Sequence, residues 1–130
     1  ELARRIAASP LLSLRGIEAF EGIIQGSKGD EAQVVSLLDR VLDVAAKAQA
    51  EGLFDGKPLL SAGGSSFFDL VAEKFSDQDR GAAFDIVLRS GCYLVHDSHF
   101  YRQMIARLTA RSPLAASLGA GLKPALELWA

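Results

Sequence analysis

Residues 57–75 read KPLLSAGGSSFFDLVAEKF and combine a short apolar run, a cluster of small residues and an amphipathic segment. Residues 57–62 are expected to form a strand, because Pro58 opens a continuous apolar run. The small residues at 63–66 break that run. Ser66 can cap a helix that has Asp69 at its third position and an apolar side made by Phe67, Phe68, Val71 and Phe75. A strand that leads through glycines into a helix is the repeating unit of α/β folds.

Similar units flank this segment. On the amino-terminal side, residues 11–20 are expected to form a strand, and Asp30 begins a long helix that runs to about Glu51 and stops at Gly52. The apolar stripe of this helix is spaced for one helical face and consists of Val34, Leu37, Leu38, Val41, Ala45 and Ala48. On the carboxyl-terminal side, a nearly all-apolar strand at 84–88, expected to be buried on both faces, precedes a helix at 100–110.

Less regular segments lie at the two ends. Residues 1–9 are expected to form the last turns of a helix that stops before Pro10. Ser112, Pro113 and the glycines at 119 and 121 indicate a loop, after which 125–130 is expected to start another strand.

The alternation of three strands and three helices predicts an α/β fold with a parallel sheet and right-handed crossovers. We expect strands within 12–20, 57–62 and 84–89 to be neighbours, with helices near 31–51, 66–75 and 99–110 packed on one side. Three βα units cannot close a barrel, so they form either a small open sheet or a slice of a (β/α)₈ barrel. Periodicity alone leaves both alternatives open.

Composition excludes several classes of function. The chain has 130 residues, 49% hydrophobic and 23% charged, with a formal net charge of −2. Such a balance gives no electrostatic case for binding nucleic acid or an anionic membrane. No apolar run approaches the roughly 18 residues of a membrane span. Cys92 is the only cysteine, so it can form no internal disulfide, and a reducing, cytoplasmic setting is expected.

Parallel α/β folds bind ligands at the carboxyl ends of their strands, which places three segments at the expected site: 18–22, 61–66 and 89–97. The glycines and serines at 63–66 can bring main-chain N–H groups and hydroxyls close to an anion. At the next strand end, Gly91 and Cys92 can donate N–H groups, and Tyr93 or Arg89 can reach a phosphate oxygen. The alternative at each position is a simple strand-end turn. A shared cradle predicts that the N–H groups of Gly64 and Ser65 and those near Cys92 converge on one point.

Other polar groups have weaker chemical interpretations. His96, Asp97 and His99 have a spacing that metal ligands can show, although they offer only three candidates and Asp97 can cap the next helix. Glu18 and Glu21 lie at the end of the first strand as an acid/base pair or as ordinary carboxylates. We therefore expect no metal site and assign no catalytic residue.

Three motifs resemble one family in order and spacing. GIEAFEG at 16–22, SAGGSS at 61–66 and RSGCY at 89–93 are similar to mid-barrel segments of D-threonine aldolases and D-serine dehydratases. The similarity is greatest to bacterial amino-acid deaminases, also called D-serine deaminases. It extends over nearly all of the chain, and the second and third motifs are specific as a pair.

The resemblance implies a pyridoxal-phosphate-binding, alanine-racemase-like (β/α)₈ barrel, of which residues 1–121 would be the carboxyl-terminal part. Residues 122–130 would open a β domain. The residues implied in holding the cofactor phosphate are Gly63, Gly64, Ser65, Gly91, Cys92 and Tyr93. The implied activity is a lyase acting on a small D-amino acid, such as deamination of D-serine to pyruvate and ammonia. Homodimerisation of the intact protein is a further expectation.

The Schiff-base lysine of the family lies near the first barrel strand, a region that this sequence does not match. The candidate lysines here are Lys28, Lys47, Lys57, Lys74 and Lys123, and none is expected to end a strand at the ligand edge. D-threonine aldolase and racemase activities on the same fold remain alternatives, as does a non-catalytic pyridoxal-phosphate-binding or carrier barrel.

Overall fold

The computed structural model describes residues 1–24, 30–63, 67–76, 83–89, 91 and 100–117. Its elements in chain order are α1 (Leu2–Ala7), β1 (Gly16–Glu18), α2 (Asp30–Ala50), β2 (Leu59–Ala62), α3 (Phe68–Phe75), β3 (Asp85–Leu88), α5 (Phe100–Arg111) and α6 (Pro113–Ser117). The expected strand at 125–130, the cap at Ser66 and the expected β domain at 122–130 lie outside the described residues.

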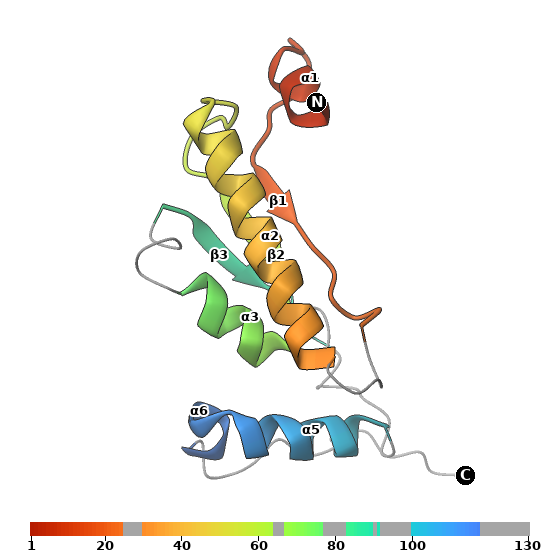
Figure 1. Ribbon diagram of the computed structural model, residues 1–130. Coiled ribbons are helices and arrows are strands. Elements are labelled where there is room, and N and C mark those ends of the chain that lie inside the picture. The colour runs from red at the N-terminus through yellow and green to blue at the C-terminus, as the bar shows by residue number, and fades with distance from the viewer. Residues whose placement is uncertain (25–29, 64–66, 77–82, 90, 92–99, 118–130) are drawn as a thin grey trace, which may run out of the picture.

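The three strands form one parallel sheet in the order β1-β2-β3, as the alternation of strands and helices predicted (Figure 1). Ile17 pairs with Leu60, and Leu60 pairs with Ile86, so these three side chains form one row across the sheet. The backbone pairing continues past the strands, since the Arg89 N–H donates to the Ala62 carbonyl at 3.0 Å. All three strands therefore end at the same edge.

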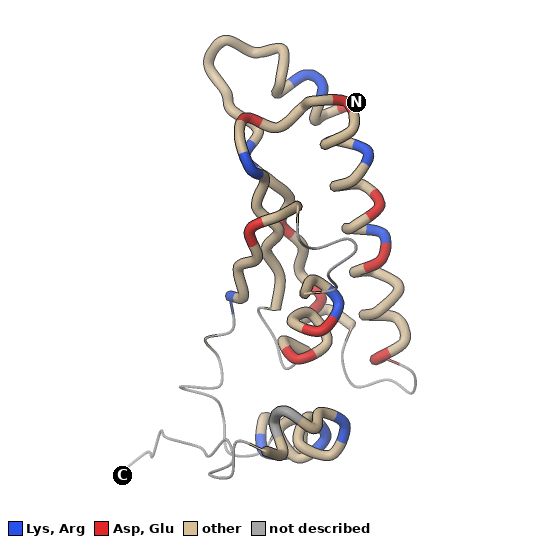
Figure 2. Tube along the Cα trace, turned by 90° about the vertical axis from the view of Figure 1, so that its left-hand side faces the viewer, with Lys and Arg blue, Asp and Glu red and all other residues tan. Residues whose placement is uncertain are grey.

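Helices α2 and α3 cover one face of this sheet. The core contains Leu60 and Ala62 of β2 and buried residues of both helices. Those of α2 are Val34, Leu38, Val41, Leu42 and Ala45, and they meet Val71 and Phe75 of α3 and Phe67, which directly precedes α3. In the view turned by 90°, α2 runs alongside the strands, with acidic and basic residues distributed along it (Figure 2). The predicted stripe is confirmed, and Leu42 is a further buried residue that the prediction left out.

Helix α2 ends where the sequence predicted, at a left-handed glycine. Gly52 has φ +65°, a conformation that costs glycine nothing but strains residues with a Cβ. Its N–H donates to the Gln49 carbonyl at 2.9 Å, and the Leu53 N–H donates to the Ala48 carbonyl at 3.0 Å. This pair of bonds is a Schellman motif, which satisfies carbonyls that the end of the helix would leave exposed.

Three expectations about the strands and loops are wrong. The segment expected as a strand from residue 11 is regular only at Gly16–Glu18, because the carbonyl of Leu14 accepts the N–H of Asp55, in the loop before β2. β3 is not buried on both faces, since Val87 and Leu88 are each 42% exposed at the edge of the sheet. The loop expected at 112–121 contains α6, which begins at Pro113, a residue well suited to the first helical position.

The position of α5 also differs from the expectation. Its bounds agree with the predicted helix, but it does not pack on the sheet beside α2 and α3. It lies across their amino-terminal ends, below the carboxyl edge of the sheet in Figure 1. None of the helices in the described ranges combines the length and apolar character that crossing a bilayer requires.

Two valines of α2 provide a test of this core. Val34 is fully buried and Val44 is 55% exposed. We expect Val34→Ala to lower the free energy of unfolding by about 2 kcal/mol, because it removes two buried methyl groups and leaves a cavity. Val44→Ala makes the same chemical change outside the core and should alter it by less than about 0.5 kcal/mol. Urea denaturation of both variants measures the difference, and equal effects would contradict the assigned helix face.

Candidate functional site

The carboxyl edge of the sheet brings together residues from all three strand ends. An arginine cluster, defined as Arg89, Ser61, Glu18 and the Ala19 carbonyl, lies on the face that α2 and α3 leave uncovered. Arg89 Nε donates to Ser61 Oγ at 2.9 Å, and its Nη2 donates to the carbonyl of Ala19 at 2.8 Å. The same Nη2 lies 3.2 Å from Glu18 Oε1.

Strand geometry explains why these side chains meet. Successive side chains of a strand point to opposite faces, so Ile17 and Leu60 enter the core while Glu18 and Ser61 point away from it. Arg89 follows β3 by one residue and has the parity of Val87, which is paired with Ser61. Two contacts other than the carboxylate hold the guanidinium, so its place does not depend on Glu18. The cluster presents a preorganised cation at the ligand edge of a parallel sheet.

A second feature of this edge is the conformation of Gly63, which directly follows β2. Gly63 is buried and has φ +81°, in the left-handed region. A Cβ at this position would lie 3.2 Å from Leu88 Cδ2 and 3.4 Å from Phe68 Cβ, so a side chain here would be both strained and crowded. The N–H of Gly63 donates to Glu21 Oε2 at 3.2 Å, across a separation of 42 residues. Conformation and space therefore both favour glycine at the end of β2.

The structure describes two of the six predicted phosphate-binding residues. Gly63 directly follows β2 in a left-handed conformation, and Gly91 is exposed, with no non-neighbouring heavy atom of the described residues within 4 Å of a Cβ built on it. Pairing of β2 with β3 brings their ends to neighbouring positions, as the sequence predicted. Gly64, Ser65, Cys92 and Tyr93 lie outside the described residues, so the convergence of their N–H groups stays a prediction.

The two glutamates occupy different environments. The Glu18 side chain is 70% exposed and pairs with Arg89, whereas Glu21 is 0% exposed and accepts the Gly63 N–H. One is thus a carboxylate at the rim and the other a buried carboxylate, which agrees with the ordinary alternative for both. Their described contacts do not join them as an acid/base pair.

Within the described residues, neither a group of metal ligands nor a lysine side chain lies at the carboxyl edge. His96, Asp97 and His99 lie outside these residues, and no group of three or more metal-ligating side chains occurs among them. Lys57 lies before β2 on the opposite rim, as predicted, and its Nζ contacts Asp85 Oδ1 at 2.7 Å. Lys47 is on the exposed side of α2, and Lys74 Nζ bonds Asp39 Oδ1 at 3.2 Å. Lys28 and Lys123 lie outside the described residues.

An open hollow of about 260 Å³ lies far from the strand ends, between α1, residues 12–14 and the loop that follows α2. The hydroxyl of Ser13 donates to the Asp55 carboxylate, and the Asp55 N–H donates to the Leu14 carbonyl at 3.0 Å. Because these polar groups bond to one another, the hollow offers no obvious recognition chemistry.

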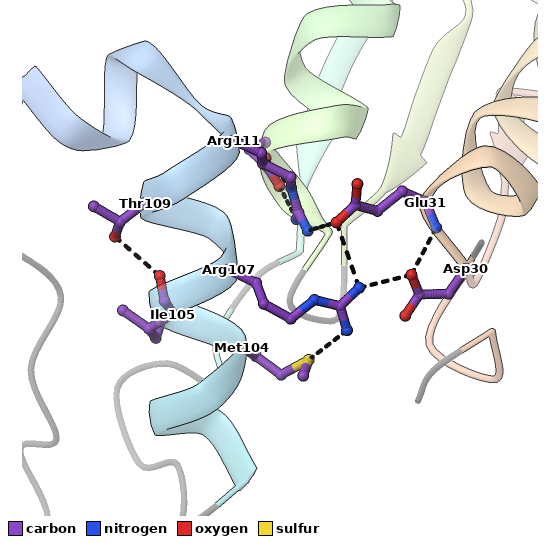
Figure 3. Close-up of polar contacts among 8 residues, drawn as sticks. Asp30, Glu31, Met104, Ile105, Arg107, Thr109 and Arg111 are labelled. Atoms are coloured by element: carbon purple, nitrogen blue, oxygen red, sulfur yellow. Dashed lines mark hydrogen bonds and ion pairs between the residues drawn. The ribbon is translucent and has the colours of Figure 1, made fainter. Parts of the chain in front are cut away.

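An ion-pair network, which no sequence motif predicted, fixes α5 at the carboxyl edge. Figure 3 shows its side chains. Arg111 forms a two-point contact with Asp69, Nε to Oδ2 at 2.7 Å and Nη2 to Oδ1 at 2.6 Å. Arg107 Nη2 donates to Asp30 Oδ1 at 2.8 Å, and Glu31 Oε1 accepts from Arg111 at 3.0 Å and from Arg107 at 3.4 Å. The acids belong to the first turns of α2 and α3, where a carboxylate is favoured by the helix dipole.

The network raises the pKa of both arginines. Its hydrogen bond to Asp30 raises the pKa of Arg107 above its ordinary value, more than burial lowers it. Burial lowers the pKa of Arg111, but the hydrogen bonds and charges of Asp69 and Glu31 outweigh this effect and raise it. Arg111 also stacks over the Phe67 ring, with 5.3 Å between its guanidinium carbon and the ring centroid. Both cations are therefore stabilised as charged groups.

No protein-family model matches this chain, and no curated protein matches it either.

The Arg111–Asp69 contact is the pair to test, because the side chains are only 16% and 9% exposed. We expect Arg111→Ala to lower the free energy of unfolding by about 2 kcal/mol or more, since it leaves a nearly buried carboxylate without its two-point partner. Arg102→Ala removes the same charge from an exposed position of α5 and should change stability by less than about 0.5 kcal/mol. Urea titrations measure both changes. An unaltered free energy of unfolding in Arg111→Ala would contradict the stabilising role of the network.

Proposed function

We propose that this chain contributes the phosphate-binding strand ends of a pyridoxal-phosphate-dependent lyase that acts on a small D-amino acid. The observation that supports the proposal is the carboxyl edge of the sheet, where the cation of Arg89 lies on the ends of β1 and β2 and Gly63 has a left-handed conformation. The substrate class comes from the resemblance of the three sequence motifs to D-serine deaminases and related enzymes.

The sheet supports a barrel slice over a doubly wound sheet as the finer fold. Doubly wound sheets carry helices on both faces and reverse their strand order. Here the order is sequential, and α2 and α3 share one face. On the other face, Leu59 and Val87 are 37% and 42% exposed. In a closed barrel this face would point inward, where such apolar side chains would be covered.

The described residues fit a phosphate group in two respects and oppose it in one. Arg89 supplies a positive charge, and Gly91 leaves open space for close main-chain approach. Against this, Glu18 and Glu21 place carboxylates at the same edge. The residues proposed to hold the phosphate are Gly63, Gly64, Ser65, Gly91, Cys92 and Tyr93.

Division of labour follows from these contacts. The chemistry that pyridoxal phosphate supplies when bound is withdrawal of electrons from the carbon that loses a proton or bond. The residues of this chain bind and orient: glycines admit the anion, and Arg89 attracts and positions it. The lysine that holds the cofactor covalently is proposed to come from another part of a longer polypeptide, because Lys47, Lys57 and Lys74 lie away from the edge.

Arg89 gives a direct test of cofactor binding in the full-length polypeptide that carries this chain. We expect that protein to bind pyridoxal 5′-phosphate more tightly than pyridoxal, and Arg89→Gln to weaken binding of the phosphate ester roughly tenfold by removing a charge-assisted contact. Arg40→Gln, an exposed change on α2, should leave the affinity unaltered. Fluorescence titration measures all three proteins. Equal affinities of the parent for the two ligands would refute the proposed function.

The proposed division of labour also predicts where the cofactor is attached. After borohydride reduction of the full-length protein loaded with pyridoxal phosphate, peptide mapping should find the modified lysine outside Lys28, Lys47, Lys57, Lys74 and Lys123. The same loaded protein should release pyruvate from D-serine. Modification of any of these five lysines would overturn the assignment.

A further inference from the structure

Glu21 is a fully buried carboxylate that the proposed function does not use. It lies beyond the end of β1, and its side chain reaches the turn after β2, where Oε2 accepts the N–H of Gly63 at 3.2 Å. Burying an ionisable carboxylate is costly unless hydrogen bonds or charges compensate it. The hydrogen bond from the Gly63 N–H offsets part of this cost and ties Glu21 to the main chain at the carboxyl edge.

The contact acts on the point where the chain leaves the sheet. The last described bond between β2 and β3 is the one from the Arg89 N–H to the Ala62 carbonyl, and Gly63 is the next residue. Its N–H is buried among side chains, where an unsatisfied donor costs about 1–3 kcal/mol. By accepting this N–H, Glu21 fixes the peptide plane that begins the left-handed turn.

Packing around Gly63 limits the conformations that are open to its backbone. Gly63 packs against Leu88 and Phe68, so the backbone has little room on that side. A glycine without such support would sample other φ values at small cost. The hydrogen bond to Glu21 therefore selects one orientation from those that glycine permits.

We infer that Glu21 is a positioning residue, which holds the Gly63 N–H and so fixes the left-handed conformation of the residue that follows β2, in preparation for a phosphate group. This inference rests on the proposed function for the identity of the ligand. Glu21 acts through Gly63 and contributes no attraction for the anion, because a carboxylate repels a phosphate. Reach to the N–H, and not charge, is the property that matters.

Three substitutions separate reach from charge. Glu21→Gln keeps an acceptor oxygen at the same distance from the backbone and removes the charge. Glu21→Asp keeps the charge and withdraws the oxygen by one methylene group. Glu21→Leu removes the acceptor while keeping similar bulk. Leu42→Ala is the control for general destabilisation, because Leu42 is buried in the core about three turns along α2 from the end that lies at the carboxyl edge.

The experiment measures, for each full-length variant, the affinity for pyridoxal 5′-phosphate divided by that for pyridoxal. We expect Glu21→Asp and Glu21→Leu to reduce this ratio roughly tenfold, as the loss of one buried hydrogen bond implies. Glu21→Gln and Leu42→Ala should keep the parent ratio. If Glu21→Leu does not fold, the ratios of Glu21→Asp and Glu21→Gln still decide whether the hydrogen bond is needed.

Failure of the inference and failure of the proposed function give different results. A parent that prefers the phosphate ester, with Glu21→Asp unchanged, overturns the role of Glu21 alone. A ratio that falls equally in Leu42→Ala also overturns it. A parent without any preference overturns the proposed function and the phosphate role together. In that case, amide exchange at Gly63 that is faster in Glu21→Asp than in Glu21→Gln would still support the positioning contact, and equal exchange would remove it too.

Discussion

Pairing of β2 on both of its sides is the interaction on which the rest of this structure depends. Its main chain bonds to β1 through the register Ile17–Leu60 and to β3 through Leu60–Ile86, so one short strand aligns two others. Because the pairing is parallel, each crossover must pass over a face of the sheet, and α2 and α3 supply the apolar cover. The shared direction of the strands also delivers Glu18, Ser61 and Arg89 to one edge, and without this register the arginine cluster would not form.

Much of this arrangement could be predicted from local patterns in the sequence. The stripe from Val34 to Ala48 located the core face of α2, and Gly52 located its end, because helix periodicity and left-handed glycines depend on neighbouring residues alone. The alternation of strands and helices predicted the parallel sheet for a different reason, because such alternation is typical of strands joined by right-handed crossovers. Gly63 was singled out because glycines break the apolar run of β2, and its positive φ is a conformation that favours glycine.

Contacts between distant segments could not be predicted in this way. Residues 11–15 look like a strand by composition, but the Leu14 carbonyl is bonded by the loop residue Asp55, so the ladder begins only at Gly16. Val87 and Leu88 are apolar without being buried, since burial depends on what covers an edge. The position of α5 depends on Arg107 and Arg111 meeting acids some 40 to 80 residues away. The sequence does show acidic residues in the first turns of α2 and α3, but it does not indicate which basic residues bind them.

Helix α1 has a consequence for how the molecule would come apart. None of its side chains is buried, and the two-point pair of Arg4 with Glu51, at 2.7 and 2.8 Å, joins it to the end of α2 on the exposed surface. Salt screens exposed pairs of this kind, and segments with little buried area open at low free energy. A protease should therefore cut around Pro10–Leu12 long before it reaches the sheet, and raised ionic strength should hasten that first cut.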